Sequence, residues 1–415
     1  MPDPFRFFVG IDLGSQTHQV HVIDAADQSL GQRSVAHRGS DLEQLFAWLS
    51  QLTGAEPQQV AVAAEAPHGA MIEACLDHGL AVFSINPKQL DRFRDRFSVA
   101  GAKDDSRDAR VLAHSLRTDQ HCFRLLDLAD PRLLRLRELS RAQDSLGVDF
   151  RRSANQLWQF LQRYFPALLT LVPAADEPWL WALLQIAPLP ASAARLRPAK
   201  LEQLLKQHRI RRFTAAQLQD QLREPPLPLA PGVAEAVAEQ VLLLLPRLRL
   251  VHQQQAQLNR RIEQLIEELA ADTDFREHRD VQILRSVPGV GRVFTATVLS
   301  EATRALAQRD YHAFRALAGV APVTSQSGKT KLVCMRRACN RRLRDAVFHS
   351  ASVHAQRDPR AHQHYLRLRQ RGHSRGRALR GVADRLLALL FALLQTGQCY
   401  DPSRRSSGGE LVSLP

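Results

Sequence analysis

The sequence predicts an α/β domain at the N-terminus, a long helical middle part and a mostly α-helical C-terminal part. The chain begins with short apolar or alternating segments separated by turns, which is typical of a strand meander in a mixed sheet. Amphipathic repeats with helical spacing follow from about 130 to 275. The last third combines helical repeats with a large excess of Arg and Lys.

The N-terminal segments alternate between strand and helix patterns. The strand pattern, which is apolar or alternates between apolar and polar residues, occupies 6–13, 18–24, 29–36, 59–65 and 80–85. The helix pattern occupies 40–53, 68–79 and the residues from 87 onward. Strands interleaved with helices in this way predict an α/β domain that ends near residue 120.

The middle part contains two long amphipathic segments separated by proline-rich stretches. Pro188, Pro190 and the stretch 224–228 interrupt the helical pattern and mark either loops or a small inserted subdomain. We expect the two long helices to pair as an antiparallel coiled-coil arm. Their apolar faces carry Leu133, Leu134, Leu136, Leu139 and Leu146 in the first helix, and Leu258, Ile262, Leu265, Ile266 and Leu269 in the second.

Together these patterns divide the chain into an α/β domain at 1–125, a helical linker with a proline-rich insertion at 126–278, a basic C-terminal domain at 279–400 and a flexible tail at 401–415. The sequence has no apolar run long enough to span a membrane, and its N-terminus lacks the pattern of a signal peptide. Its five cysteines are scattered, and no further Cys or His pair completes a zinc site with Cys334 and Cys339. We therefore expect a cytoplasmic protein with no membrane partner.

Positive charge is concentrated in one region of the chain. Residues 281–400 hold 21 Lys and Arg against 5 Asp and Glu, a net charge of +16, whereas residues 1–280 hold 33 against 35, a net charge of −2. Charge that served solubility alone would spread evenly along the chain. We expect the C-terminal part to neutralise backbone phosphates of nucleic acid, with binding that weakens as salt rises.

Four acidic residues of the N-terminal domain fit a divalent-metal site. Asp12 and Glu65 each follow an apolar run, so both carboxylates are expected at strand ends. Asp105 and Asp108 lie three residues apart at the start of an expected helix and therefore share one face. Clustered carboxylate oxygens are the ligands that Mg²⁺ or Mn²⁺ prefers, and these ions support phosphodiester chemistry.

Each of these acidic residues, taken alone, has a plainer explanation. An Asp near a Gly is common in turns, and acidic residues near a helix start often cap the helix. Glu73 is an alternative to Glu65, since it also follows apolar residues, although it falls inside an expected helix. The order of the four residues on a strand, a strand and a helix favours one shared site.

A turn between two expected helices is a candidate for phosphate contacts. The segment 286–292 contains Pro-Gly-Val-Gly followed by Arg, and such a turn exposes backbone N–H groups, as in a helix-hairpin-helix element. An ordinary glycine-rich connection between helices would look the same. The basic context of Gly289, Gly291 and Arg292 favours nucleic acid.

A second glycine-containing segment follows at 318–331. Its Gly-Lys-Thr string is not a nucleotide-binding loop, because Val323 occupies the position where that loop requires an earlier glycine. Ser327 precedes this string, and Lys329 and Lys331 could offset the charge that develops when a serine attacks a phosphodiester. An ordinary turn serine would have the same surroundings.

Arginines crowd the residues after this segment. The first group is expected on one helix that lies along a phosphate backbone: Arg336, Arg337, Arg341, Arg342 and Arg344. The apolar stretch Leu386–Leu394 is expected to be a core helix. A second group of arginines precedes it: Arg367, Arg369, Arg371, Arg375, Arg377 and Arg380.

At these positions the chain resembles the RuvC-like DEDD transposases of the IS110 insertion-sequence family. Asp12, Glu65 and the Lys-x-Asp-x-x-Asp-Ala string at 103–109 resemble that family's catalytic set. The Val-Pro-Gly-Val-Gly turn, the Gly-Val-Ala-Pro…Gln-Ser-Gly string and the arginine-rich helix resemble its second domain. The resemblance covers nearly the whole chain in the same order. One departure is Cys339, which precedes Asn340 where the family usually has Gly.

The resemblance implies a ribonuclease-H-like N-terminal domain, a coiled-coil linker and a C-terminal transposase domain with a helix-hairpin-helix-like element. It implies that Ser327, selected over Ser325 by the Gln-Ser-Gly match, becomes transiently linked to DNA while a metal ion held by the four carboxylates activates the reaction. The two parts of the active site are expected to meet between subunits of a dimer or tetramer. A structured guide RNA from the element's flank is expected to pair with donor and target DNA, near the nucleoid of a prokaryote.

Three other functions are compatible with parts of the sequence. A nuclease of the Holliday-junction-resolvase type would use the same carboxylates with water as nucleophile and would need no serine. The segment 11–15 also resembles the first phosphate loop of actin-like sugar kinases, but no convincing second loop follows. A non-catalytic nucleic-acid-binding protein would leave the acidic set unexplained.

Overall fold

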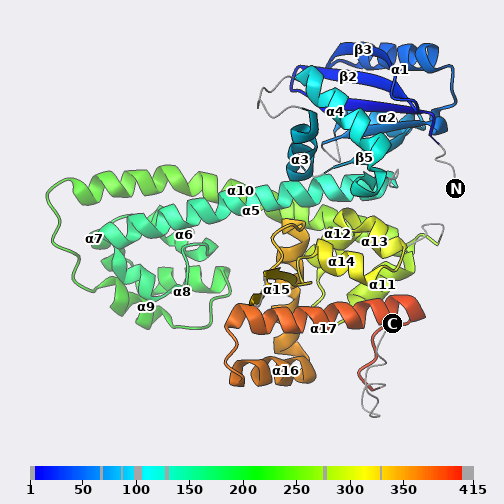
Figure 1. The fold of residues 1–415 in the computed structure, drawn as a ribbon. Helices are drawn as coiled ribbons and strands as arrows, with labels where there is room; N and C mark the ends of the chain where they lie inside the picture. The colour runs from blue at the N-terminus through cyan, green and yellow to red at the C-terminus, as the bar shows by residue number, and fades with distance from the viewer. Residues whose placement is uncertain are drawn as a thin grey trace. The chain divides into compact units, whose positions relative to one another are not determined.

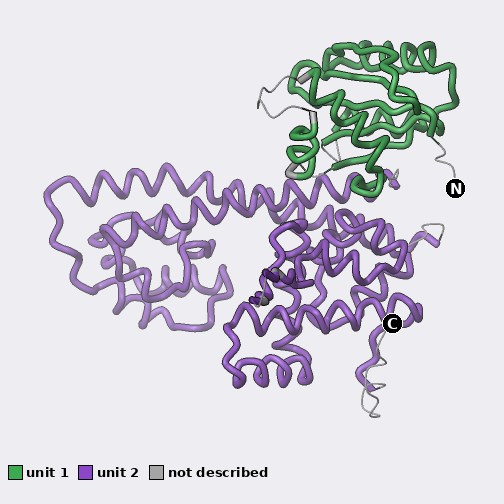
Figure 2. Tube along the Cα trace, viewed as in Figure 1, with its two compact units in different colours: residues 1–129 green, residues 130–415 purple. Residues whose placement is uncertain are grey.

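The structure, a computed structural model, describes residues 5–65, 69–85, 87–97, 105–126, 130–273, 278–327 and 330–403. The chain forms two compact units, residues 1–129 and residues 130–415 (Figure 2). Each unit has hydrophobic clusters of its own. No helix in the described ranges is long and apolar enough to cross a membrane.

A six-stranded mixed sheet forms the centre of unit 1, in the order β3-β2-β1-β4-β5-β6 (Figure 1). The first three strands form the antiparallel meander expected from the sequence, β4 runs parallel to β1, and β5 runs parallel to β4. The short antiparallel β6 was not predicted. The strands are β1 (Phe7–Leu13), β2 (Thr17–Asp24), β3 (Ser29–Ala36), β4 (Val60–Ala64), β5 (Ala81–Ser84) and β6 (Arg124–Leu125).

Helices cover both faces of this sheet. Side chains of α1 and α2 pack on one face, with Val9 and Ile11 of β1, and side chains of α3 and α4 pack on the other, with Phe8. The two faces alternate along β1 because successive side chains of a strand point in opposite directions. The helices of this unit are α1 (Gly39–Thr53), η1 (Pro57–Gln59), α2 (Ala70–Asp77), α3 (Pro87–Phe97), α4 (Asp105–Thr118) and η2 (Gln120–Cys122).

The contact between β1 and α4 is unusually close at Gly10. A Cβ atom added to Gly10 would lie 1.8 Å from the backbone oxygen of Ala109 and 2.6 Å from the backbone nitrogen of Ala113. Only glycine on the strand, facing alanines on the helix, allows the two backbones to approach this far. The contact fixes the first half of α4 against the strand that carries Asp12.

In unit 2 the two long helices predicted from the sequence lie side by side (Figure 1). They are α5 (Pro131–Tyr164) and α10 (Val233–Ala271). Arg132 at the start of α5 pairs with Asp272 just after α10, and Gln143 donates to the side-chain oxygen of Asn259 at 2.7 Å. Residue numbers therefore fall along one helix as they rise along the other, and the pair is antiparallel. Its supercoiling as a coiled coil stays a prediction.

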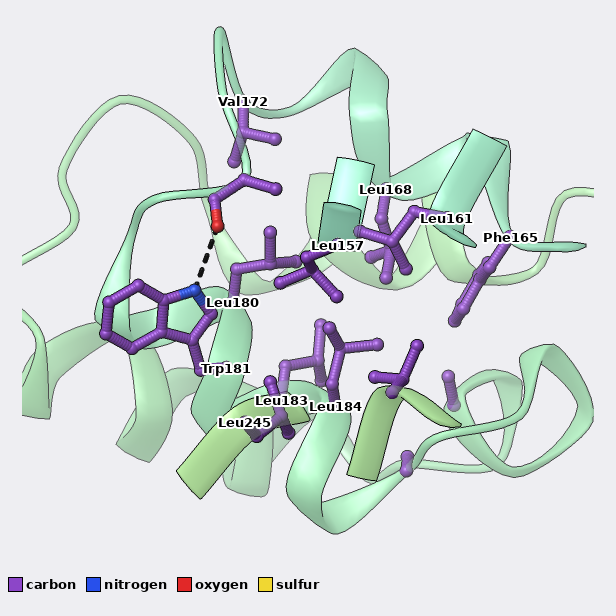
Figure 3. Packing of buried hydrophobic residues seen from close by; sticks show 14 of the residues in the cluster. Leu157, Leu161, Phe165, Leu168, Val172, Leu180, Trp181, Leu183, Leu184 and Leu245 are labelled. Carbon is purple, nitrogen blue, oxygen red and sulfur yellow. Dashed lines mark hydrogen bonds between the residues drawn. The ribbon is translucent and has the colours of Figure 1, made fainter. Parts of the chain in front are cut away.

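Between these two helices the proline-rich stretch builds a small helical subdomain. It consists of η3 (Pro166–Thr170), α6 (Pro178–Ile186), α7 (Pro190–Ala194), α8 (Pro198–Gln207) and α9 (Ala215–Leu222). Proline occupies the first position of α6, α7 and α8, where a helix needs no N–H donor, so these prolines begin helices. Leu157 of α5 and Leu245 of α10 join its core, in which the Trp181 indole donates to the Ala175 carbonyl at 2.9 Å (Figure 3).

The last part of unit 2 is mostly helical with one β-hairpin. The apolar stretch Leu386–Leu394 is largely buried, which confirms the predicted core helix. One expectation is corrected: Arg336 and Arg337 precede the arginine-rich helix, because Asn340 caps it and Arg341 is its first residue. The elements are α11 (His278–Ser286), α12 (Arg292–Glu301), α13 (Thr303–Ala307), α14 (Tyr311–Leu317), β7 (Val323–Ser327), β8 (Thr330–Cys334), α15 (Arg341–Arg357), α16 (Pro359–Gln370) and α17 (Arg375–Thr396).

Candidate functional site

Asp12 and Glu65 occupy equivalent positions on two neighbouring parallel strands. In the β1–β4 pair, Ile11 lies opposite Ala64, and each acidic residue comes directly after its member of this pair. Because parallel strands end at the same edge of a sheet, both residues lie at the carboxyl edge. Both are half-buried. The sequence predicted the strand-end position of each residue, and the register places the two next to each other.

Side-chain alternation puts both acidic residues on the α4 face of the sheet. Phe8 packs in the cluster beneath α3 and α4, and Asp12 has the same parity on β1. Ala63 of β4 belongs to that same cluster, and Glu65 continues its parity by two residues. The first turn of α4, with Asp105 and Asp108, therefore belongs to the same layer as the two strand-end carboxylates.

Asp108 is already bound by an arginine of the neighbouring helix. Arg94 of α3 donates from Nε to Oδ1 and from Nη2 to Oδ2 of Asp108, both at 2.7 Å. Arg94 also pairs with Asp91. Burial opposes the charge of Arg94, but the hydrogen bonds and charges of Asp108 and Asp91 raise its pKa. The Asp108 side chain is 5% exposed, so this guanidinium is the cation that balances it. The side chain of Asp105 lies outside the described residues.

The donor set has the chemistry that a hard divalent cation requires, namely carboxylate oxygens from strands and a helix on one face. The side chains of Asp12, Glu65 and Asp108 do not come within metal-ligand spacing of one another. Among the described residues, that spacing is met in η2 and beside it by Asp119, His121 and Cys122. A cation at the strand ends would need Arg94 to release Asp108. The metal-binding role of the four carboxylates stays a prediction.

The Pro-Gly-Val-Gly turn lies between α11 and α12, as the sequence suggested. Gly289 has a φ of 91°, and a Cβ atom there would lie 2.6 Å from the backbone nitrogen of His354. The His354 ring Nδ1 also lies 2.7 Å from the Pro288 carbonyl oxygen, so the turn is fastened to α15. Gly291 and Arg292, at the start of α12, are exposed. The exposed end of this turn is therefore the first turn of α12.

Ser327 is the last residue of β7 and lies beside the end of a β-hairpin. It pairs with Thr330 of β8 and is exposed. The sequence suggested a polar turn, whereas the structure puts this serine at the strand end that leads into it. Gly328 and Lys329 lie outside the described residues, as do the side chains of Ser325 and Lys331.

The arginines around α15 differ in what they contact. Arg341 is exposed, and Arg344 pairs with the neighbouring Asp345. Arg342 lies inside unit 2, where it binds Asp144 of α5 at 2.6 Å and the buried Glu301 at the end of α12. Arg342 is therefore committed to contacts within the protein, while Arg341 faces solvent.

Glu301 joins three elements around this arginine. It accepts hydrogen bonds from Arg141 of α5, from Asn340 at the start of α15 and from Arg342. Burial would raise the pKa of Glu301, but the hydrogen bonds and charges of Arg141, Asn340 and Arg342 hold it below its ordinary value. Sequence reasoning missed this residue. Its signal is its isolation, since it is the only acidic residue between 281 and 309 in a basic segment.

Cys339 also has a structural explanation. Gly319 has a φ of 66°, and a Cβ atom on it would lie 2.9 Å from the Cys339 Sγ atom. The thiol side chain thus fills the space above this glycine. The departure from the family pattern at 339 is accommodated by a tight contact beside the cap residue Asn340.

Comparisons with known proteins agree along the whole chain. A family model described as a transposase of the DEDD, IS110 type matches residues 9–166, and one described as a transposase of the IS116/IS110/IS902 family matches residues 281–366. The mini-circle putative transposase for IS117 of Streptomyces coelicolor is 32% identical over 410 residues, which are 97% of each chain. The putative transposase y4uE of Sinorhizobium fredii is 46% identical over 216 residues, 52% of this chain and 60% of that protein. An uncharacterized 43.6 kDa protein of insertion element IS110 from S. coelicolor is 28% identical over 98% of each chain.

Proposed function

Because the chain belongs to the IS116/IS110/IS902 family of transposases, we propose that it excises and inserts a mobile DNA element with a carboxylate metal site and a serine nucleophile. Membership of this family makes the protein an enzyme that cuts and rejoins DNA. It also removes the sugar-kinase and non-catalytic alternatives. The observation that carries the proposal is the Ile11–Ala64 register, which sets Asp12 beside Glu65 at one edge of the sheet.

The carboxylates of Asp12, Glu65, Asp105 and Asp108 would hold a divalent cation, Mg²⁺ or Mn²⁺. Such an ion, when bound, polarises the phosphoryl oxygen and stabilises the charge that develops on it. The protein supplies the scaffold: two strand ends in register and a helix whose backbone lies against β1 at Gly10. Arg94 neutralises Asp108 until that carboxylate is needed.

Ser327 is the proposed nucleophile. Its hydroxyl oxygen attacks the DNA phosphorus, the bond between phosphorus and one sugar oxygen breaks, and the hydroxyl proton ends on the released sugar oxygen. A sugar hydroxyl of a second DNA end then attacks the phosphoserine, which restores Ser327 and rejoins the strands. Both steps exchange one phosphate ester for another, so no co-reactant is consumed. Exposure of Ser327 at the hairpin end supports this role, because DNA must reach the hydroxyl.

Nucleic-acid contacts and assembly complete the proposal. The exposed first turn of α12, the lysines beside Ser327 and the basic residues before and within α15 would contact phosphates, with Arg342 supporting the others from inside. An element-encoded guide RNA and a dimer or tetramer follow from the family resemblance. The proposed contact residues are Gly289, Gly291, Arg292, Lys329, Lys331, Arg336, Arg337, Arg341, Arg342 and Arg344.

Substitution of the carboxylates tests the metal site. Asp12→Asn, Glu65→Gln and Asp108→Asn should each abolish Mg²⁺-dependent cleavage and leave DNA binding in a gel-shift assay largely unchanged, because each removes one charge at nearly constant shape. Glu73→Gln is the matched control, since Glu73 lies exposed on α2. Cleavage at the wild-type rate by one of the three variants would remove that residue from the site.

A further inference from the structure

The α16–α17 hairpin carries a dense group of arginines that the proposed site does not use. Between 357 and 385 the chain has nine arginines and two acidic residues. Both acidic residues are engaged inside the protein. Asp358 caps α16 and accepts from the Tyr400 hydroxyl at 2.8 Å, and Asp384 binds Arg315 of α14. Neither therefore neutralises the outer surface of the hairpin, which lies at one end of unit 2 (Figure 1).

Four of these arginines flank the line along which α16 and α17 touch. The helices meet at Gly381, where an added Cβ atom would lie 2.6 Å from Leu368 and 3.5 Å from the Nε2 atom of His364. On α16, Arg367 follows His364 by one turn, and Arg371 follows by two, just beyond the helix end. On α17, Arg377 and Arg385 lie one turn to either side of Gly381. We name these four exposed arginines, Arg367, Arg371, Arg377 and Arg385, the α16–α17 seam.

The seam concentrates positive charge without compensation. The pKa of His364 is lowered, first by burial and then by the charges of Arg385, Arg367 and Arg371, which shows that three guanidinium groups converge on one imidazole. No carboxylate among the described residues pairs with the four seam arginines. Like charges held this close destabilise the free protein, so the arrangement fits a surface whose counter-charge comes from a bound polyanion.

We propose that the α16–α17 seam binds the phosphate backbone of duplex DNA, as a docking surface additional to the contacts around Ser327 and α15. Packed helix axes lie about 10 Å apart, and two rows of guanidinium groups on such a pair are spaced like phosphates across the ~12 Å major groove of B-DNA. The deep, narrow major groove of A-form RNA fits this spacing less well. The inference rests on the proposed function only in naming DNA as the partner.

The test compares DNA affinity across a salt series without Mg²⁺, so that no chemistry is involved. The full-length quadruple variant R367Q/R371Q/R377Q/R385Q should bind a DNA duplex more weakly. Its slope of log affinity against log salt should be shallower by about 3, since each lost phosphate contact removes roughly 0.9 from the slope. The double variants R367Q/R371Q and R377Q/R385Q should each give about half of this change, which keeps the test open if the quadruple variant folds poorly.

The matched control removes the same charge elsewhere in unit 2, at exposed residues of the inserted subdomain and α10: R197Q/K200Q/K206Q/R247Q. It should leave the slope close to the wild-type value, because a long-range effect of net charge is screened by salt. Equal slopes for the seam variants and the control would overturn the proposal. A loss confined to an RNA duplex of the same sequence would also overturn it. Failure of Ser327→Ala to block cleavage would leave this test unaffected, which separates it from the proposed chemistry.

Discussion

Arg94 and Asp108 form a two-pronged ion pair in which both carboxylate oxygens accept hydrogen bonds of 2.7 Å. A carboxylate that is held in this way cannot also offer its oxygens to a metal ion. The pair joins α3 to α4, so the state in which Asp108 binds a cation differs from this one at least in the position of the Arg94 side chain. Arg94 stands where a positive charge is required in either state.

Arg94→Gln should therefore separate stability from metal binding. Removing the partner of a buried charge should lower the free energy of unfolding by about 3 kcal/mol without metal. Because Asp108 is then free, added Mn²⁺ should raise the unfolding temperature more in the variant than in the wild type.

Arg96→Gln is the control for this measurement, since Arg96 lies on the same helix and pairs with Asp119 near the surface. It should cost less than about 1 kcal/mol and leave the metal response unchanged. An equal rise of the unfolding temperature in the wild type and in Arg94→Gln would show that Arg94 does not compete with metal.

The close contact at Gly10 gives a prediction for the scaffold. Gly10→Ala would place a methyl group where the backbone of α4 lies, so α4 must shift away from β1. We expect a loss of about 1–3 kcal/mol in the free energy of unfolding, together with a strong loss of cleavage. Gly39→Ala, at an open position in α1, should be neutral or slightly stabilising. Wild-type cleavage by Gly10→Ala would mean that the position of α4 does not matter to the site.

Glu301 should make the stability of unit 2 depend on pH. Its pKa in the folded protein lies below the ordinary value of 4.5, so its contribution is complete above that value and is lost as pH falls through the folded pKa. Glu301→Gln should lower the free energy of unfolding at neutral pH by about 1–3 kcal/mol. The difference from the wild type should shrink below pH 4.5. Asp345→Asn, at an exposed pair with Arg344, is the control. A difference that stays constant with pH would contradict this role.

Local sequence patterns predicted the elements that depend on local chemistry. Apolar runs before Asp12 and Glu65 gave β1, β4 and the strand-end positions, and the helical repeats gave α5 and α10. The start of α15 could also have been predicted, because Asn340 is a typical cap residue whose side chain accepts from the Leu343 N–H.

Long-range pairings were not predictable in this way. The Arg94–Asp108 pair depends on how α3 packs against α4, and Glu301 gathers Arg141 from a helix 160 residues earlier in the chain. The β7–β8 hairpin was missed because both of its faces are exposed, which removes the alternation of apolar and polar residues that marks a strand. Leu332 and Val333 are adjacent in the sequence and 58% and 65% exposed.

The most direct measurement is the covalent protein–DNA species formed by Ser327→Ala compared with the wild type, observed on denaturing gels with Mg²⁺ and element-end DNA. The substitution removes one exposed hydroxyl at the end of β7, so the fold and DNA binding should be retained. The account predicts that Ser327→Ala loses both the covalent species and cleavage, whereas Ser325→Ala keeps both. Continued cleavage by both variants would contradict the account and would establish a hydrolytic nuclease that uses water as its nucleophile.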